Sequence, residues 1–274
     1  MDPSTSVAAA RGVPTAGTRR EHIRERVAAE GFASVAELAA MFSVSEVTVR
    51  NDLERLAARG QVRRVRGGAV PRTLELPERS FEQTAGVASA AKAAIGRAAA
   101  GLVSSGETVI LDVGTTTTAV ARALVARDGL ADVTVITSGL TTALELEPGI
   151  PRLSVLVTGG TLRPLQHSLV EPMGSRMFAE LYADVVFLGC NGVDPERGIT
   201  NVNLPEVEIK RRALAAANRR VVVADGSKLG RVAFAAFGQL DDIDVLITSE
   251  DADPEILAAI EDQGVTAIVA DSAA

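Results

Sequence analysis

The chain has 274 residues, a length that fits one small and one medium domain better than one small domain. Hydrophobic residues make up 47% and aromatic residues 3%, so we expect a core of Val, Leu, Ile and Ala, as in helices packed on parallel strands. The single cysteine excludes an internal disulfide framework. No apolar run approaches the ~20 residues that span a bilayer. We therefore expect a cytoplasmic protein with no membrane partner.

The net charge of −7 argues weakly against a nucleic-acid partner, but the charge is unevenly distributed. Residues 1–18 are small, polar and neutral and lack the apolar stretch of a signal peptide, so a disordered leader is expected. Residues 19–72 contain 11 Arg against 7 Asp and Glu, a net charge of +4. This leaves −11 for residues 73–274. A basic head on an acidic body is typical of a DNA-binding domain that carries a second domain.

Three helices are predicted in the basic segment. The first covers residues 20–30. The second begins after Ser34, which has the capping-box spacing to Glu37, and a three-residue link leads to a third helix that ends near residue 59. Two helices, a short turn and a third helix form a helix-turn-helix. The predicted core positions of the three helices are Ile23, Val27, Val35, Leu38, Ala39, Phe42, Val49, Leu53 and Leu56.

The outer face of the third helix carries side chains suited to the DNA major groove. Its first turns enter the groove, where Arg can bind guanine and Asn can bind adenine. Gly67 and Gly68 lie between two β-prone runs and predict a hairpin whose arginines meet the DNA backbone. Which of these side chains contacts bases rather than phosphates stays open. The predicted DNA-binding residues are Ser45, Thr48, Arg50, Asn51, Arg63, Arg64 and Arg66.

Residues 71–89 have mixed charge and two prolines and are predicted to form a linker with room for a short helix. From residue 90 to 274, helices alternate with buried strands, which predicts an α/β domain with a mostly parallel sheet covered by helices on both faces. Ligands bind such sheets beyond the carboxyl ends of the strands. The predicted strands cover residues 108–113, 133–137, 154–158, 184–189, 220–224, 245–248 and 265–270, and the predicted helices cover residues 90–103, 116–126, 140–146, 171–181, 205–217 and 254–263.

Polar or glycine-rich loops follow five of these strands. After the first strand, Gly114 leads into four threonines and a helix, so that amides and hydroxyls converge on a helix N-terminus, a position that favours phosphate. A capped helix start explains that turn alone at least as well. The recurrence of such loops at 137–139, 158–160, 191–192 and 224–228 favours a ligand site. Lys228 could neutralise a phosphate or pair with Asp225.

The run Ser45-x-x-Thr48-Val49-Arg50-Asn51-Asp52-Leu53, followed by Leu56, Gly60 and Arg66-Gly67-Gly68-Ala69, resembles the N-terminal signature of the DeoR/GlpR family of bacterial repressors. The resemblance continues in the second domain. Its motifs there are Asp112-x-Gly-Thr-Thr-Thr, Thr137-Ser138, Gly159-Gly160, Gly189-x-x-Gly192, Gly198-Ile199-Thr200, Glu206-x-x-x-Lys210 and Ala224-Asp225-x-Ser227-Lys228. These are similar to the family's effector domain, whose fold resembles ribose-5-phosphate isomerase.

The resemblance implies a winged helix-turn-helix over residues 19–70 and an effector domain over residues 90–274. It implies a homo-oligomer, dimer or tetramer, that represses sugar-metabolism genes and is released from double-stranded operator DNA by a phosphorylated sugar. The sugar, the operator and the sign of regulation stay open. The effector-binding residues so implied are Asp112, Gly114, Thr115, Thr116, Thr117, Thr118, Thr137, Ser138, Gly159, Gly160, Asn191, Gly192, Glu206, Lys210, Asp225 and Lys228.

An active isomerase is the first alternative. Aldose–ketose isomerisation needs a carboxylate that shuttles a proton, and the loop that begins with Asp in the isomerases begins here with Asn191. Asp194 and Glu206 remain as carboxylates, so the loss is suggestive only. We expect a sensor with no catalytic residues and no cofactor. A protein that coats DNA without sequence preference, with affinity set by salt, is the second alternative.

The chain is poor in metal-ligating and nucleophilic residues. With two histidines and one cysteine, no Cys/His metal site is expected. His167 is either a plain loop residue or a contact to the sugar. Cys190 is expected to be a small buried group rather than a redox sensor.

Overall fold

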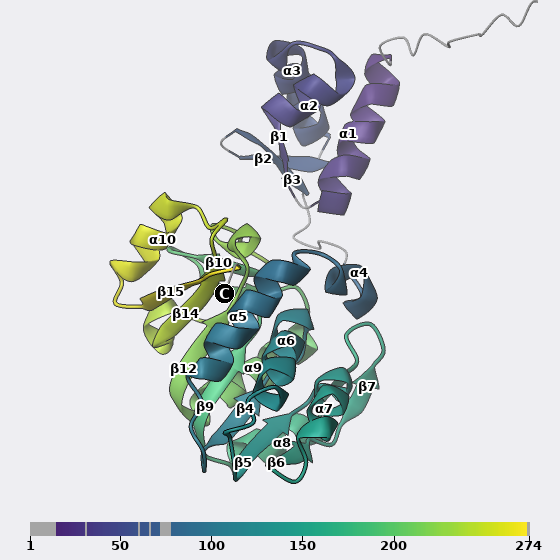
Figure 1. The fold of residues 1–274 in the computed structure, drawn as a ribbon. Coiled ribbons are helices and arrows are strands. Elements are labelled where there is room, and N and C mark those ends of the chain that lie inside the picture. Colours follow the sequence, from purple (N-terminus) through teal and green to yellow (C-terminus); the bar gives the residue numbers. More distant parts are fainter. Residues whose placement is uncertain (1–14, 31, 60, 66, 72–77, 273–274) are drawn as a thin grey trace, which may run out of the picture. The chain divides into compact units, whose positions relative to one another are not determined.

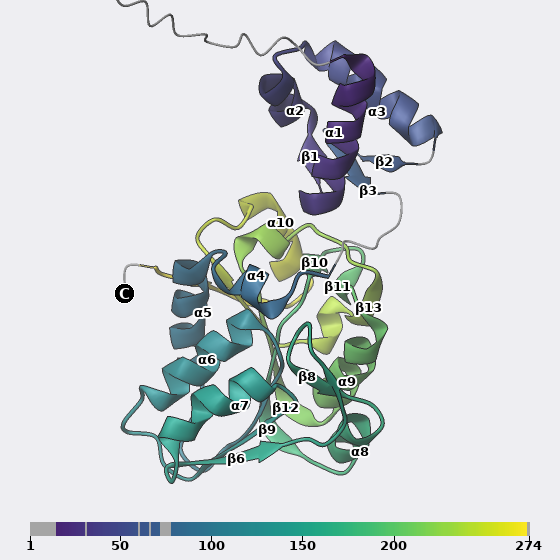
Figure 2. The same ribbon diagram turned by 90° about the vertical axis from the view of Figure 1, so that its right-hand side faces the viewer.

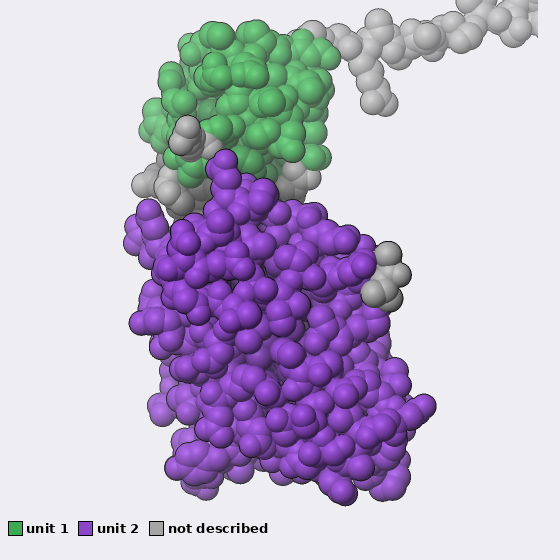
Figure 3. Space-filling view, turned by 60° about the vertical axis from the view of Figure 1, so that its left-hand side comes forward, with its two compact units in different colours: residues 1–77 green, residues 78–274 purple. Residues whose placement is uncertain are grey.

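The computed structural model describes residues 15–30, 32–59, 61–65, 67–71 and 78–272. The chain forms two compact units, residues 1–77 and 78–274, which Figure 3 colours separately. Residues 78–89, placed in the linker on the basis of sequence, are part of the second unit. The predicted leader lies outside the described residues except for its last four, and α1 (Ala16–Glu30) begins within those four.

The described part of the first unit contains three helices and a three-stranded antiparallel sheet of order β1-β3-β2 (Figure 1). The helices α2 and α3 and the hairpin of β2 and β3 confirm the predicted winged helix-turn-helix, whereas the two-residue strand β1 was not predicted. Gly68 must be glycine, since a Cβ there would lie 2.3 Å from the Ala33 carbonyl oxygen of the paired strand. The remaining bounds are β1 (Ala33–Ser34), α2 (Val35–Phe42), α3 (Glu46–Ala58), β2 (Val62–Val65) and β3 (Gly68–Pro71).

A local signal sets the start of α2 as predicted, whereas α1 begins four residues before its predicted start at residue 20. The Ser34 hydroxyl accepts from the Glu37 amide and the Glu37 carboxylate accepts from the Ser34 amide, a complete capping box. Each helix then turns its apolar stripe inward. The buried core consists of Ile23, Val27, Ala33, Val35, Leu38, Phe42, Val49, Leu53, Leu56, Val62 and Ala69.

The second unit is built on a seven-stranded sheet in which every neighbouring pair is parallel, as the α/β alternation predicted. The strand order is β15-β14-β12-β9-β4-β5-β6. The predicted strands all occur, with ends shifted by at most three residues. Their bounds are β4 (Thr108–Leu111), β5 (Val133–Thr137), β6 (Leu153–Val157), β9 (Ala183–Leu188), β12 (Ala217–Val223), β14 (Val245–Ser249) and β15 (Thr266–Ala270).

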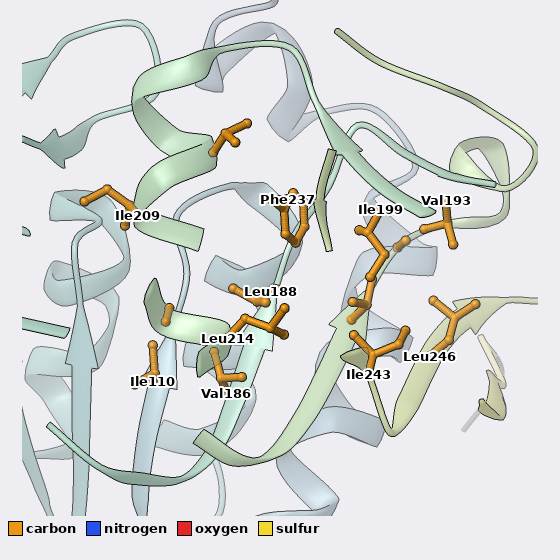
Figure 4. Close-up of a cluster of buried hydrophobic side chains, with 14 of the residues drawn as sticks. Ile110, Val186, Leu188, Val193, Ile199, Ile209, Leu214, Phe237, Ile243 and Leu246 are labelled. Carbon is orange, nitrogen blue, oxygen red and sulfur yellow. The ribbon is translucent and has the colours of Figure 1, made fainter. Parts of the chain in front are cut away.

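Helices cover both faces of the sheet (Figure 2). Because successive strand residues point to opposite faces, Val109 and Leu111 pack with α5, α6 and α7, whereas Ile110 packs with α8, α9 and α10. Figure 4 shows part of the second cluster. The helices are α5 (Ser89–Gly101), α6 (Thr115–Val125), α7 (Leu140–Leu146), α8 (Met173–Ala179), α9 (Leu204–Ala215) and α10 (Pro254–Glu261).

Small residues bring α5 and α6 unusually close. A Cβ on Gly96 would lie 2.6 Å from the carbonyl oxygen of Ala119, so only glycine allows this crossing. The close approach places the first turn of α6, where the threonine-rich loop ends, beside α5.

Several short elements escaped prediction because three or four residues show no reliable periodicity. They are the hairpin β7 (Thr161–Arg163) and β8 (Ser168–Val170), the small sheet of β10 (Gly192–Asp194), β11 (Gly198–Asn201) and β13 (Ala235–Gly238), and the 3-10 turns η1 (Glu147–Gly149), η2 (Gly226–Lys228) and η3 (Leu240–Asp242). The short helix α4 (Phe81–Ala85) lies within residues 71–89, where the sequence left room for one.

Candidate functional site

The order of the strands locates the site in the second unit. From β4 the chain adds β5 and β6 on one side, and then β9, β12, β14 and β15 on the other. The sheet therefore has its switch point between β4 and β9, the position at which open parallel sheets bind ligands. Asp112 follows β4 and Gly189 follows β9 at this point. Two of the predicted motifs thus meet at the switch point.

Asp112 and Lys210 form a buried ion pair at the switch point. The Lys210 ammonium, from α9, contacts the Asp112 carboxylate and donates to the Gly189 carbonyl oxygen at 3.0 Å. The Gly189 amide donates to Asp112 at 2.9 Å. Each side chain of the pair is 3% exposed. Burial raises the pKa of the Asp112 carboxyl, and Lys210 opposes that effect. The pair lies beneath the threonine-rich loop and links the ends of β4 and β9 to α9.

The threonine-rich loop forms the predicted turn into a helix. Gly114 has φ +123°, a backbone conformation that favours glycine, and its carbonyl oxygen accepts from the Thr118 amide at 2.9 Å. The hydroxyls of Thr117 and Thr118 also donate to this oxygen, at 3.0 and 2.7 Å, and both side chains are buried. Thr115 and Thr116 are half-exposed. The first amides of α6 have no intrahelical acceptor, so these amides and the Thr115 and Thr116 hydroxyls are the groups left for an anion.

A pocket of about 270 Å³ opens between α5 and α6 beside this loop. Thr115 from α6 and Lys92 from α5 both line it. Burial lowers the pKa of Lys92, against the opposing effect of Asp225 and together with a smaller effect of Lys228. The charges of Asp225 and Lys228, in the loop after β12, therefore influence the ammonium group of Lys92 on α5. The other polar residues of the lining are Ser89, Arg97 and Arg122.

Lys92 was missed in the sequence because α5 has an ordinary helical composition. One signal was available. Lys92 lies three and seven residues before Ile95 and Ala99, so it occupies a core stripe, and a cation in a core stripe is unusual unless it has a partner. Its ammonium donates to the Thr84 carbonyl oxygen at 2.8 Å.

Glu206 and Arg163 form the second polar cluster of the site. The buried Glu206 carboxylate accepts from Arg163 at 2.7 Å, from the Ser168 hydroxyl at 2.9 Å and from Asn201 at 3.4 Å. Arg163 also donates to Glu78 at 2.6 Å. Burial lowers the pKa of Arg163, but the two carboxylates outweigh burial and raise it. Arg163 is therefore held between two carboxylates of the second unit, Glu206 from α9 and Glu78, which precedes α4.

The remaining predicted residues lie at the same edge of the sheet, but several have structural partners. Thr137 and Ser138 are buried after β5, and the Thr137 hydroxyl accepts from the Gly139 amide. Gly160, which follows Gly159, has φ +143°, and a Cβ there would lie 2.0 Å from the Val170 carbonyl oxygen. Gly160 therefore allows the β7–β8 hairpin to pair, whereas a Cβ on Gly159 would lie 3.2 Å from the Met173 side chain.

The loop after β9 is also occupied by internal contacts. The Asn191 side chain accepts from the Val202 amide at 3.0 Å, and a Cβ on Gly192 would lie 2.2 Å from the Arg231 carbonyl oxygen. Cys190 precedes them and is half-buried, and desolvation raises the pKa of its thiol to about 12, as expected for an inert thiol rather than a redox sensor. In the loop after β12, Ser227 donates to the buried Asp225, and Lys228 is half-buried.

His167 contacts protein groups on both ring nitrogens. Nδ1 lies 2.7 Å from the Thr141 hydroxyl and Nε2 lies 3.1 Å from Glu82. The ring stacks on Phe81 at 5.3 Å between centroids. His167 was predicted to be either a plain loop residue or a contact to the sugar. Its contacts with Phe81 and Glu82 show a third role, which is to hold α4 in place.

In the first unit, α3 presents the predicted face. Ser45 caps the helix, accepting from the Thr48 amide at 3.1 Å, while Arg50 and Asn51 are exposed. Arg50 pairs with Glu46 at 2.6 Å. Val47, which sequence reasoning missed, is 62% exposed in the first turn, where an apolar side chain can meet a thymine methyl group.

The hairpin is tied to this helix through Arg64, which pairs with Glu54 at 2.7 Å. Arg66 lies outside the described residues, as does the side chain of Arg63. A buried pair that was not predicted holds the unit together behind this face. Arg19 of α1 donates to Asp52 of α3 at 2.6 Å, and Arg20 lies 3.6 Å from the same carboxylate.

The described part of the chain lacks both a metal-binding cluster and a membrane-spanning helix. No group of three or more His, Cys, Asp or Glu side chains is arranged to hold a metal ion there. Among the same residues, no helix combines the length and the apolar composition that crossing a membrane requires.

Comparison with known proteins identifies both units. Residues 19–73 match the DeoR-like helix-turn-helix domain, and residues 87–250 match the DeoR C terminal sensor domain. The chain belongs to the DeoR family of transcriptional regulators. The predicted family is confirmed, and with it the assignment to a regulator rather than to an enzyme.

Relatives in this family align over nearly their whole length. The HTH-type transcriptional regulator GolR of Listeria innocua is 34% identical over 87% of this chain and 92% of its own. The regulator GlpR of Haloferax volcanii is 36% identical over 91% and 96%, and the transcriptional repressor AccR of Agrobacterium fabrum is 31% identical over 84% and 88%. A ribose 5-phosphate isomerase from Plasmodium falciparum, at 16% identity and a TM-score of 0.37 over 50% of this chain and 51% of that chain, is similar in fold alone.

Proposed function

We propose that this DeoR-family regulator is a repressor of sugar-metabolism genes that a phosphorylated sugar releases from its operator. The observation that carries the ligand assignment is the pocket that Thr115 and Lys92 line together. A helix N-terminus, hydroxyls and an ammonium group are three kinds of phosphate partner in one place. That the phosphate belongs to a sugar follows from the family resemblance, and repression is supported by the relative AccR, which is a transcriptional repressor.

Within this proposal, the site residues take different roles. The amides and hydroxyls of Thr115 and Thr116 bind the phosphate, and Lys92 and Lys228 balance its charge. The buried Asp112–Lys210 pair supports the loop from below, because both groups are already satisfied. Glu206 and Arg163 face the rest of the sugar. Asn191, in the place of a catalytic Asp, accepts from a backbone amide and supplies no base.

The DNA-binding part of the proposal rests on the exposed face of α3. Arg50 and Asn51 are free to turn toward base edges, because Arg50 pairs only with the exposed Glu46 on its own helix. Arg64, and the residues Arg63 and Arg66 predicted from the sequence, contact phosphates from the hairpin. A homo-oligomer would place two such helices on two half-sites. The exposed Leu156 and Val157 on β6, an edge strand of the sheet, support an interface between copies in this part of the chain.

The test needs an operator and a ligand panel. A duplex selected by the wild-type protein from a random library serves as operator, and a thermal-shift screen of sugar phosphates, free sugars and inorganic phosphate identifies the ligand. A ligand at 100 times its dissociation constant stabilises the protein by about 2.7 kcal/mol. We expect the same compound to release the duplex in a gel-shift titration.

One pair of variants tests the location of the pocket. Thr116→Glu places a carboxylate where the phosphate binds, so this variant should hold the duplex at every ligand concentration. Thr116→Ser keeps the hydroxyl and should respond as the wild type does. Normal release of Thr116→Glu by the ligand would show that the phosphate binds elsewhere.

A further inference from the structure

We propose that residues Glu78–Ala85, here called the strap, couple the pocket to the DNA-binding unit because the ligand takes over the two cations that hold the strap. This inference rests on the proposed function, since the ligand is the phosphorylated sugar of that site. The strap includes α4 and begins directly after residue 77, the last residue of the first unit. A change in the strap therefore acts on the segment that leads to the DNA-binding unit.

Arg163 is the first anchor of the strap. Its guanidinium donates to both carboxylate oxygens of Glu78, at 2.6 and 3.3 Å, while it also donates to Glu206. Asn203, the N-cap of α9, donates to Glu78 at 2.8 Å. The Glu78 side chain is only 16% exposed in this arrangement. A carboxylate from the strap is thus seated among the polar groups of the sensor site.

Lys92 is the second anchor. Its ammonium reaches out of α5 to the carbonyl oxygen of Thr84, in the last turn of α4. The same ammonium belongs to a residue that lines the pocket with Thr115. A neutral carbonyl is a weaker partner for a buried ammonium than an anion is. A phosphate bound at Thr115 would therefore be a stronger partner for the Lys92 ammonium than the Thr84 carbonyl oxygen is.

Between the two anchors, the strap rests on the loop between β7 and β8. The Phe81 amide donates to the Leu165 carbonyl oxygen at 2.8 Å, and the Gln166 side chain donates to the Arg79 carbonyl oxygen at 2.5 Å. His167 stacks on Phe81 and pairs with Glu82. These contacts come from the hairpin that carries Arg163, so loss of the Arg163 anchor loosens the strap along its length.

The ligand and the strap then compete for the same donors. Ligand oxygens replace the Glu78 carboxylate as the partner of Arg163 and the Thr84 carbonyl oxygen as the partner of Lys92. The strap then detaches from the rest of the second unit. The seated strap belongs to the state that binds DNA, and the released strap to the state that does not. By linkage, any change that weakens the strap must strengthen ligand binding and weaken operator binding.

The variant Glu78→Gln tests this in the full-length protein, because Glu78 is outside the proposed ligand contacts. Three quantities are measured: hydrogen exchange of residues 79–86, affinity for ribose 5-phosphate and inorganic phosphate at constant ionic strength, and affinity for the selected operator duplex. We expect exchange in the strap to rise about tenfold, the affinity for a bound probe to rise about tenfold, and operator affinity to fall by a similar factor. Glu147→Gln, an exposed carboxylate in η1, is the matched control and should change none of the three.

The outcomes separate this inference from the proposed function. Faster exchange in Glu78→Gln with unchanged probe affinity would overturn the coupling. If neither probe binds the wild-type protein or protects it thermally, the proposed ligand class fails. The operator affinity of Glu78→Gln is then the measurement that tests the role of the strap. An operator affinity equal to that of the wild type would then overturn it. Gln166→Ala loosens the middle of the strap and provides the same test if Glu78→Gln does not fold.

Discussion

Lys210 of α9 contacts the carboxylate of Asp112 where β4 ends, and both side chains are shielded from solvent at the switch point of the sheet. The pair spans two layers of the domain, since α9 covers one face and Asp112 begins the loop that carries the threonines. A buried ion pair costs desolvation energy for both groups. It persists here because the Gly189 amide and carbonyl oxygen complete the hydrogen bonding of both partners.

Removal of one partner of the Asp112–Lys210 pair should therefore lower the stability of the protein strongly. Lys210→Met leaves the Asp112 carboxylate buried and unpaired, and we expect it to lower the free energy of unfolding by about 3–5 kcal/mol in urea titrations. The matched control is Arg212→Met, which removes an exposed pair with Glu208 on the same helix and should cost about 1 kcal/mol or less. The double variant Asp112→Asn with Lys210→Met should recover part of the loss, and a double variant no better than Lys210→Met would contradict this account.

The Asp52 carboxylate has a comparable position in the DNA-binding unit. Asp52→Ala removes the buried ion pair between α3 and Arg19 of α1, so α1 should separate from α3 more often, and amide exchange at Ile23 and Val27 should speed up by about 100-fold. Glu54→Ala, on the same helix, breaks only the exposed pair with Arg64 and is the control. Equal exchange rates in the two variants would count against a structural role for the Arg19–Asp52 pair.

Alanine substitutions at Gly192 and Gly129 distinguish the effect of steric crowding at the backbone from the effect of a change in chain flexibility. Gly192→Ala places a Cβ 2.2 Å from the Arg231 carbonyl oxygen, so the β10 strand must shift, and we expect destabilisation of about 1–3 kcal/mol in thermal unfolding. Gly129→Ala meets no atom within 4 Å and should change stability by about 0.5 kcal/mol or less. A normal melting temperature for Gly192→Ala would mean that the loop after β9 is less tightly packed than described.

Cys190 should be nearly inert toward alkylating reagents in the native protein. A thiol pKa of about 12 instead of the ordinary 9.0 lowers the thiolate fraction at pH 8 about 1000-fold. Because the thiolate is the reactive form, iodoacetamide should modify the folded protein slowly and the unfolded protein rapidly, and the folded rate should keep rising well above pH 9. A folded rate within about tenfold of the unfolded rate would refute the assignment of Cys190 as an inert thiol.

Arg50 should decide operator affinity more than the general charge of α3 does. Arg50→Ala removes a side chain that can bind guanine, and we expect operator affinity to fall by about 1–3 kcal/mol while the helix remains folded by circular dichroism. Arg59→Ala removes the same charge at the far end of α3 and should have a smaller, salt-dependent effect. Equal losses for both variants would favour electrostatic attraction over base recognition.

The sequence by itself determined what local chemistry and periodicity encode. The capping box of Ser34 and Glu37 marked the start of α2, and the alternation of apolar runs predicted the parallel sheet with helices on both faces. The spacing of the threonine-rich loop placed a helix N-terminus after Gly114. These features depend on neighbours in the chain, so a single sequence is enough to predict them.

Only the tertiary structure decided which side chains have partners. Thr117 and Thr118 looked equivalent to Thr115 and Thr116, but folding buries the first two against the Gly114 carbonyl oxygen, leaves the second two half-exposed and places Thr115 in the lining of a pocket. Lys92 became a site residue because Gly96 lets α5 approach α6, and Glu78 became part of the sensor because Arg163, 85 residues later, binds it. Contacts across such separations in the chain leave no periodic pattern, since burial and pairing depend on how distant elements pack.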